Sequence, residues 1–294
     1  RSMESVIEKQ PDAAAGYRVL ATLYSDGKFR HDKGIRAMRR AFELDPNHPM
    51  NSFGNAYMHW RLGDYDSTAL WMNHVAKLVP DSEEARVYRG WAFIAQRNFE
   101  SAREEFYRSN SRSFFYWVGI FYLGGVDTAE GRPGDAIDRY RDYAAAFDGR
   151  DSNANFYFGI ASIQAYRALG EQDKAQALID ELMSAMNADS STTYHDAPIH
   201  TASIYALAGQ KEAAIEILQD WVSRGGTASL LRQDIRHGLG VLADDPRYQS
   251  ILRTVDDRLS EQKANLARWE ASGEMPLMPS VVNDPEYSDS TSSR

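Results

Sequence analysis

The 294-residue sequence contains no cysteine, so disulfide bonds and thiolate metal sites are excluded. Acidic residues outnumber basic ones, 42 to 33. A net charge of −9 without a polybasic segment argues against binding to nucleic acid or to an anionic membrane surface. Long hydrophobic runs are missing as well: the most apolar stretch, Phe114 to Leu123, is too short to span a bilayer and is interpreted as a buried helix. We expect a soluble protein, and the sequence does not choose between cytoplasm and periplasm.

The sequence lacks the motifs that usually indicate a catalytic site. There is no Gly-x-Ser-x-Gly nucleophile turn, and the glycine pairs Gly124-Gly125 and Gly225-Gly226 lack the Lys-Ser/Thr partner of a phosphate-binding loop. His195 and His200 are five residues apart, which is not the spacing of two zinc ligands on one helix. We therefore expect no enzymatic activity, no cofactor and no metal site.

What the sequence does contain is a repeated unit, seen most clearly between Pro46 and Pro80. An apolar helix through Tyr57 and Trp60 leads to a turn at Gly63, and a second apolar helix then ends at Pro80. The unit returns with a period of about 34 residues. Six such units are predicted, at 14–48, 49–82, 83–116, 117–150, 156–189 and 195–228.

These units resemble tetratricopeptide repeats (TPR), and the resemblance covers roughly Met3 to Gly226. It implies an all-α fold: a right-handed superhelix, or α-solenoid, of about six helix pairs that bury their apolar faces by stacking. Asp26-Gly27 is expected to turn the chain in the first unit, and Arg97-Asn98 in the third, where a glycine would be typical. Gly90 is interpreted as a glycine that lets two helices approach closely.

The pattern changes after Gly226. A short helix is predicted over 229–237, followed by a long one to about Ser272 with Asp245 as N-cap and Pro246 at its first position. We interpret this region as the terminal cap of the array. The segment 242–252 also resembles the ends of TPR arrays in bacterial multidomain signalling proteins. In those, the array follows a winged-helix domain (CadC-like regulators) or a class III cyclase domain.

The predicted division of the chain has four parts. Residues 1–12 are interpreted as the remnant of a preceding repeat helix, with a cloning remnant at its start, so that the native protein is expected to continue further. Residues 13–228 form the TPR array, 229–272 the capping helices, and 273–294 an extended tail. Apolar tail residues such as Met275 and Val282 should hold the tail against the cap helix or a neighbouring molecule; occupation of the aromatic groove, of this copy or of a neighbour, is the alternative. The N-terminal edge and the tail are the predicted routes of self-association.

One surface is predicted to bind a partner. The first helix of each unit lines the concave side of a TPR array, and in the second to fourth units this side is rich in large residues. The predicted partner-binding residues are Met50, Phe53, Tyr57, Trp60, Arg61, Val87, Trp91, Ile94 and Phe121. The competing interpretation is that part of this stripe belongs to the core. The function expected is a scaffold that binds a peptide or partner domain in this groove; the alternative is a sensory or regulatory module of a larger signalling or transcription-regulator protein.

Overall fold

The computed structural model describes residues 11–109, 113–147, 152–188, 197–228, 238–280 and residue 282. Within these ranges the chain is helical and contains no strand. The helices are α2 (Ala14–Lys28), α3 (His31–Leu44), α4 (Pro49–Leu62), α5 (Tyr65–Leu78), α6 (Glu83–Ala95), α7 (Phe99–Arg108), α8 (Phe114–Ala129), α9 (Pro133–Phe147), α10 (Ser152–Ala168), α11 (Gln172–Ala188), α12 (Ala197–Leu207), α13 (Lys211–Ser223), the short 3₁₀ helix η2 (Leu239–Leu242) and α15 (Pro246–Ser272). The short helix predicted over 229–237 and the helical piece before residue 11 lie outside the described residues.

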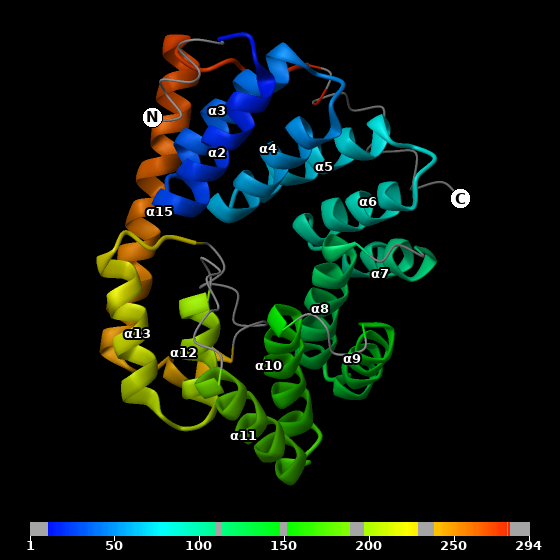
Figure 1. Cartoon of the computed structure of the whole chain (residues 1–294), viewed down its shortest axis with the longest axis vertical. Coiled ribbons are helices and arrows are strands. Elements are labelled where there is room, and N and C mark those ends of the chain that lie inside the picture. The colour runs from blue at the N-terminus through cyan, green and yellow to red at the C-terminus, as the bar shows by residue number, and fades with distance from the viewer. Residues whose placement is uncertain are drawn as a thin grey trace. The chain divides into compact units, whose positions relative to one another are not determined.

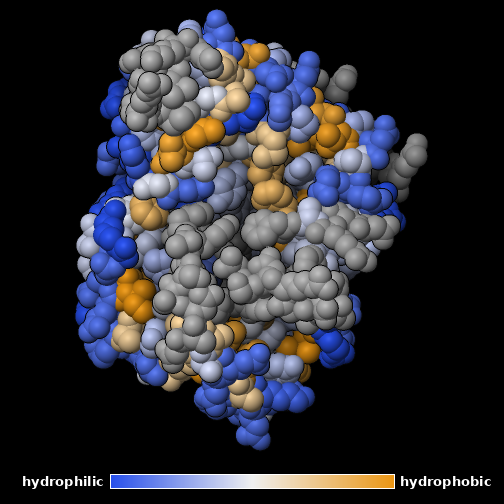
Figure 2. Space-filling model, in the orientation of Figure 1, coloured by the Kyte–Doolittle hydropathy of each residue, from blue (hydrophilic) through white to orange (hydrophobic). Residues whose placement is uncertain are grey.

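Consecutive helices pack in pairs, as the repeat predicts: α2 with α3, α4 with α5, α6 with α7, α8 with α9, α10 with α11 and α12 with α13 (Figure 1). This confirms the all-α fold of six helix pairs. The chain divides into two compact units, one of 1–111 with 227–229 and 256–294, and one of 112–226 with 230–255. No described helix is long and apolar enough to cross a membrane. On the face shown in Figure 2, the described surface is mostly hydrophilic and its apolar residues are scattered.

The turn between α4 and α5 shows how the repeat sequence sets the structure. Gly63 ends α4 with φ of 73°, a left-handed conformation that glycine adopts without strain. The N–H of Asp64 donates to the carbonyl of His59 at 2.9 Å, and the Asp64 carboxylate accepts from the N–H of Ser67 at 3.2 Å. One short segment therefore satisfies the last carbonyls of one helix and the first amides of the next.

In two other turns, a residue other than glycine takes the left-handed conformation. The turn expected at Asp26-Gly27 is wrong, because α2 continues through Gly27 to Lys28 and Phe29 takes the left-handed conformation, with φ of 52°. In the third repeat the predicted turn at Arg97-Asn98 is confirmed: Arg97 has φ of 59° and Asn98 caps α7. A side chain in this region of φ costs about 1 kcal/mol or more, so both turns need support from their surroundings.

The predicted packing role of Gly90 is also confirmed. A Cβ atom at this position would lie 2.5 Å from the Phe106 ring, which is fully buried between α6 and α7. The ring of Phe106 in turn meets Trp91 at 6.4 Å. The absence of a side chain at residue 90 therefore allows the third helix pair to close around an aromatic core.

The long helix α15 begins as predicted. It starts at Pro246, and the Asp245 carboxylate accepts a hydrogen bond from the N–H of Arg247 at 2.8 Å. Its C-terminal half, however, does more than end the array with a solvated face. Asn265 and Gln262 bind Asp32 of α3, and Gln262 also binds Phe29, two residues before α3 and more than 200 positions earlier in the chain. Trp269 is buried as well. The sequence showed a buried stripe on this helix and not the surface that covers it.

The described part of the tail leaves the end of α15 within the same unit. The N–H of Met275 donates to the carbonyl of Trp269 at 3.1 Å, and Arg39 of α3 donates to the carbonyl of Pro276 at 3.4 Å. Met275 and Val282 are buried. These contacts place Met275 at the end of α15 and Pro276 beside α3, and the packing of the tail along the cap helix stays a prediction. Residue 281 and the residues after 282 lie outside the described residues.

Candidate functional site

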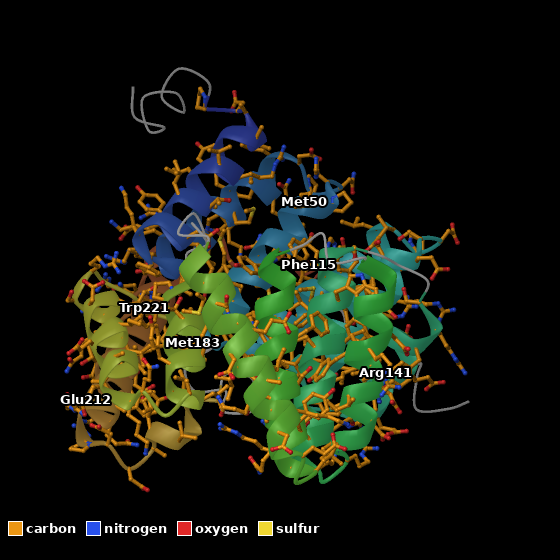
Figure 3. The ribbon with its side chains drawn as sticks, turned by 60° about the horizontal axis from the view of Figure 1, so that its bottom comes forward. Met50, Phe115, Arg141, Met183, Glu212 and Trp221 are labelled. Carbon is orange, nitrogen blue, oxygen red and sulfur yellow. The ribbon has the colours of Figure 1, made fainter. Side chains whose placement is uncertain are left out.

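Four side chains of α4 and α6 form what we call the aromatic face: Met50, Phe53, Tyr57 and Tyr88. The Phe53 ring stacks on Tyr57 with centroids 6.4 Å apart and meets Tyr88 at 5.8 Å. Phe53 itself is 5% exposed, whereas Tyr57 and Tyr88 are half-buried and Met50, at the N-terminal end of α4, is 48% exposed (Figure 3). The face therefore consists of a buried ring with accessible apolar groups around it.

The other predicted binding residues lie deeper. In addition to Phe53, six of the nine predicted residues have almost no accessible surface: Trp60, Arg61, Val87, Trp91, Ile94 and Phe121. The Trp60 and Trp91 rings meet edge to face at 5.2 Å, which ties α4 to α6. Phe121 belongs to the second unit, where it packs against Phe158 at 5.8 Å. In the free chain these residues stabilise the helix stack, and their role as ligand anchors stays a prediction.

Arg61 illustrates the difference between the expected and observed positions. It was expected to orient an acidic group of the ligand, but its side chain is 1% exposed. Its guanidinium lies 5.8 Å from the centre of the Tyr57 ring and donates to the Tyr57 hydroxyl at 3.3 Å. Arg61 therefore stabilises the aromatic face from the buried side by fixing the position of the Tyr57 ring.

Tyr88 was not among the predicted residues. The stripe of Val87, Trp91 and Ile94 has helical spacing, and it was assigned to the groove; the structure shows that this stripe is the buried side of α6. Tyr88 lies one position further around the helix, where side chains are half-buried. Burial, and then the nearby Glu84 carboxylate, raise the pKa of its hydroxyl. Tyr88 could have been predicted from its position four residues after Glu84, because the two side chains then lie on the same side of the helix, at the boundary of its solvated face.

A second feature of the same unit is a pocket of about 640 Å³, which we call the α2–α15 pocket. Its walls come from α2, α3, the end of α15 and the residues that follow α15. The lining residues are Tyr17, Leu20, Tyr24, Lys33, Arg36, Ala37, Arg40, Glu43, Trp269, Gly273, Glu274 and Pro276. Pockets of 300–1,000 Å³ are typical of ligand sites in proteins. The sequence had placed Tyr17, Leu20 and Tyr24 in an under-covered layer at the first repeat, and in the structure they are half-buried.

Cations and aromatic rings alternate in this pocket. The Arg36 guanidinium lies 5.1 Å from the centre of the Trp269 ring, and the Lys33 ammonium lies 5.5 Å from that of Tyr24. Arg36 also faces the Glu274 carboxylate at 3.7 Å. These cation–π contacts hold Lys33 and Arg36 against the aromatic rings that line the pocket.

The pocket depends on a polar contact between α15 and the start of α3, which we call the Asp32 latch. Asp32 is fully buried; its carboxylate accepts from Arg30 at 2.6 Å and from the Asn265 amide at 2.9 Å, and its N–H donates to Gln262 at 3.2 Å. Gln262 also donates to the carbonyl of Phe29 at 3.0 Å, which supports the strained turn. The latch fixes α15 beside α3, and so fixes the Trp269 wall of the pocket.

A second buried polar group lies next to it. Arg39 is 2% exposed, pairs with Glu270 at 3.6 Å and lies 5.3 Å from the Trp71 ring; burial lowers its pKa to about 10. Near it, His59 and the Asp64 carboxylate are 2.8 Å apart. Burial lowers the pKa of His59, so the neutral ring donates to Asp64; although burial alone would raise the pKa of Asp64, hydrogen bonds from His59 and Ser67 hold it at about 2.

This buried group does not resemble a catalytic site. His59 is buried, and the Asp64 carboxylate that it contacts also accepts a hydrogen bond from the backbone N–H of Ser67, as a helix N-cap does. Within the described residues, no group of three or more His, Asp or Glu side chains could hold a metal ion. We interpret these buried charges as contacts that position α15 and α4 on α3.

Comparison with known proteins identifies the fold and nothing finer. No family model and no curated protein matches the chain. Among solved structures, a tetratricopeptide repeat protein from Parabacteroides merdae ATCC 43184 matches with a TM-score of 0.54 and 15% sequence identity, over 86% of this chain and 89% of that one. The chain has a TPR-like α-solenoid fold.

The TPR-like fold narrows the function only in general terms. Repeats of this type typically act without catalysis and present extended surfaces to other proteins. The link to winged-helix regulators or cyclases receives no support from the fold or from the comparisons, and it stays a prediction. Self-association also stays a prediction; Val19 and Leu23 are the large apolar residues most exposed on α2.

Proposed function

We propose that the chain is a non-catalytic scaffold that binds a peptide or a partner domain on the aromatic face. The observation that carries this proposal is the accessible Met50, Tyr57 and Tyr88 around the buried Phe53, on the first helices of two consecutive repeats. Exposed apolar groups clustered in this way mark interaction sites, and tyrosine is among the residues that dominate binding energies.

The face is also held rigidly, which favours binding. Phe53 is fixed between two tyrosines, and Arg61 holds the Tyr57 ring. On α6, Arg89 makes two hydrogen bonds of 3.1 Å to the Glu105 carboxylate of α7. Since the side chains are already ordered, a ligand loses less conformational entropy on binding to them.

The test is a random peptide library displayed on phage and selected on the intact chain. Enriched peptides are then titrated by fluorescence anisotropy against Met50→Ala and Tyr88→Ala. Loss of an aromatic hot spot costs about 2 kcal/mol, so we expect Tyr88→Ala to weaken binding roughly 30-fold.

The control is Tyr107→Ala, which removes a tyrosine of α7 that is 48% exposed, as Met50 is. Its affinity should equal that of the unmodified chain, and circular dichroism melting should show that all variants stay folded. Enriched peptides that bind both face variants with unchanged affinity, or the absence of any enriched peptide, would refute the proposal.

A further inference from the structure

We infer that the α2–α15 pocket is a second binding site, and that its ligand is a short acidic peptide segment in which apolar or aromatic residues alternate with the acids. This inference rests on the proposed role as a scaffold, but it assigns a different surface and a defined chemistry. It is carried by the pocket's volume, its excess of cations and its aromatic walls.

The charge of the pocket is opposite to that of the chain. Its lining contains the three cations Lys33, Arg36 and Arg40 and the two carboxylates Glu43 and Glu274, in a chain with a net charge of −9. Positive charge is therefore concentrated where the walls are concave, and it attracts an anionic ligand.

Both ion pairs of the pocket are exposed to solvent. Arg40 and Glu43 are 3.0 Å apart and their side chains are 43% and 40% exposed, so this pair is weak in water. Arg36 and Glu274 are 3.7 Å apart and both are about half exposed, which makes this a weak contact in water. Within the described residues, Lys33 makes no ion pair. Glu274 shows which chemistry the pocket accepts, since it brings one carboxylate of the chain itself to the rim.

The spacing of the cations fits an extended chain. Lys33, Arg36 and Arg40 lie three and four residues apart on α3, so they form one row at steps of about 4.5–6 Å along the helix. In an extended peptide, alternate side chains point the same way and are about 6.7 Å apart. Acidic residues at every second position can thus follow this row.

The residues that flank each acid in the peptide come close to the aromatic side chains of the pocket. These side chains are Tyr17, Tyr24 and Trp269. Lys33 and Arg36 already lie over two of these rings, so a carboxylate bound by the cations comes next to an aromatic surface. Apolar or aromatic residues between the acids would bury their side chains there.

The experiment uses two synthetic mixtures of hexapeptides with blocked ends. In the acidic mixture, Glu or Asp alternates with Phe, Trp or Leu; in the basic mixture, Lys replaces the acids. Peptides retained by the intact chain are measured by affinity-selection mass spectrometry. We expect retention of acidic members, at least tenfold above the basic mixture, and a loss of this retention as the salt concentration rises.

Four variants locate the binding. The double variant Lys33→Ala/Arg36→Ala should reduce affinity for retained peptides about tenfold, since each lost charge pair is worth up to roughly fivefold. Glu274→Gln removes the competing carboxylate and should strengthen binding. Arg141→Ala, which removes one positive charge at a 70% exposed position of α9, should have no effect (Figure 3), and Tyr88→Ala should have none either.

The outcomes separate this inference from the proposed function. If Tyr88→Ala abolishes retention and Lys33→Ala/Arg36→Ala does not, the acidic peptides bind the aromatic face and the inference about the pocket is wrong while the scaffold role stands. Equal retention of both mixtures, or retention of neither, also overturns the inference. Circular dichroism melting of the double variant excludes unfolding as the cause of a loss.

Discussion

Replacement of Asp32 should release α15 from α3. The Asp32 carboxylate is fully buried and accepts four hydrogen bonds: two from Arg30 at 3.0 and 2.6 Å, one from the Asn265 amide at 2.9 Å and one from the N–H of Lys33 at 2.8 Å. Burial alone would raise its pKa, but these hydrogen bonds outweigh burial and hold the pKa below its usual value. Asp32 is therefore ionised when α15 is docked.

The size of the effect follows from what each substitution leaves behind. Asp32→Ala removes every acceptor and leaves the buried Asn265 amide without this partner. Because Arg30 is 35% exposed and stays solvated, the free energy of unfolding should fall by about 2–4 kcal/mol, less than for a fully buried pair. Asn265→Ala removes one hydrogen bond to a charged group, worth about 1.5–3 kcal/mol. Since both changes remove the same contact, the double variant should lose less than the sum, with a coupling of roughly 0.5–3 kcal/mol.

Urea unfolding of the four proteins gives the coupling, and hydrogen exchange locates it. Exchange should become faster over the C-terminal half of α15, residues 256–272, and stay unchanged in α13, which belongs to the other unit. Losses that add within about 0.5 kcal/mol, or unchanged exchange in residues 256–272, would refute the reasoning.

The same carboxylate gives a pH dependence with a defined sign. Because the folded pKa of Asp32 is lowered, its contribution is complete above the pKa of the unfolded chain, about 3.9, and is lost as the pH falls through the folded value. Asp32→Asn should therefore flatten the fall in stability below about pH 4. An unchanged acid limb in the variant would contradict this assignment.

Three further predictions concern other contacts. Gly90→Ala should destabilise the chain by about 1–3 kcal/mol, because its Cβ meets the buried Phe106 ring, whereas Gly27→Ala, at a helical position without a neighbour within 4 Å, should stabilise it by roughly 0.5–1 kcal/mol; urea unfolding compares the two. His59→Gln should flatten the loss of stability as the pH falls below about 6.5, since burial lowers the folded pKa and only the unfolded chain takes up the proton in that range; a melting series from pH 8 to 5 tests it. Arg247→Ala should leave the melting temperature nearly unchanged despite its two close carboxylate partners, since the group is exposed to solvent; a clear drop would show that surface pair to be stabilising.

Local rules predicted the helix pairs and most of their boundaries. The turn at Gly63 and the start of α15 at Asp245-Pro246 depend on a few neighbouring residues, so the sequence is sufficient for them. The prediction of the first turn was wrong because it used local residues alone. Gly27 is a good turn residue, but the chain turns at the strained Phe29, which is supported by Gln262, over 200 positions away. A local pattern holds no information about that support.

The candidate site was predicted only in outline. The stripe through Trp60 and Trp91 was assigned to the groove, with the core as the competing interpretation, because helical spacing does not tell whether a stripe faces another helix or a ligand. The α2–α15 pocket could not be predicted from the sequence, because Lys33 and Trp269 come together only through the docking of α15. Their separation in sequence gives no hint of it.

The Asp32 latch also has a consequence for the order of folding. In a stacked array most contacts join neighbouring repeats, so folding can spread from any pair. The Asp32–Asn265 bond instead joins residues 233 positions apart, and closing a loop of that length costs about 5 kcal/mol in chain entropy if the chain between them is still unfolded. The docking of α15 therefore comes late, after the pairs have formed. Weakening the latch should then speed unfolding in stopped-flow experiments while leaving the refolding rate nearly unchanged.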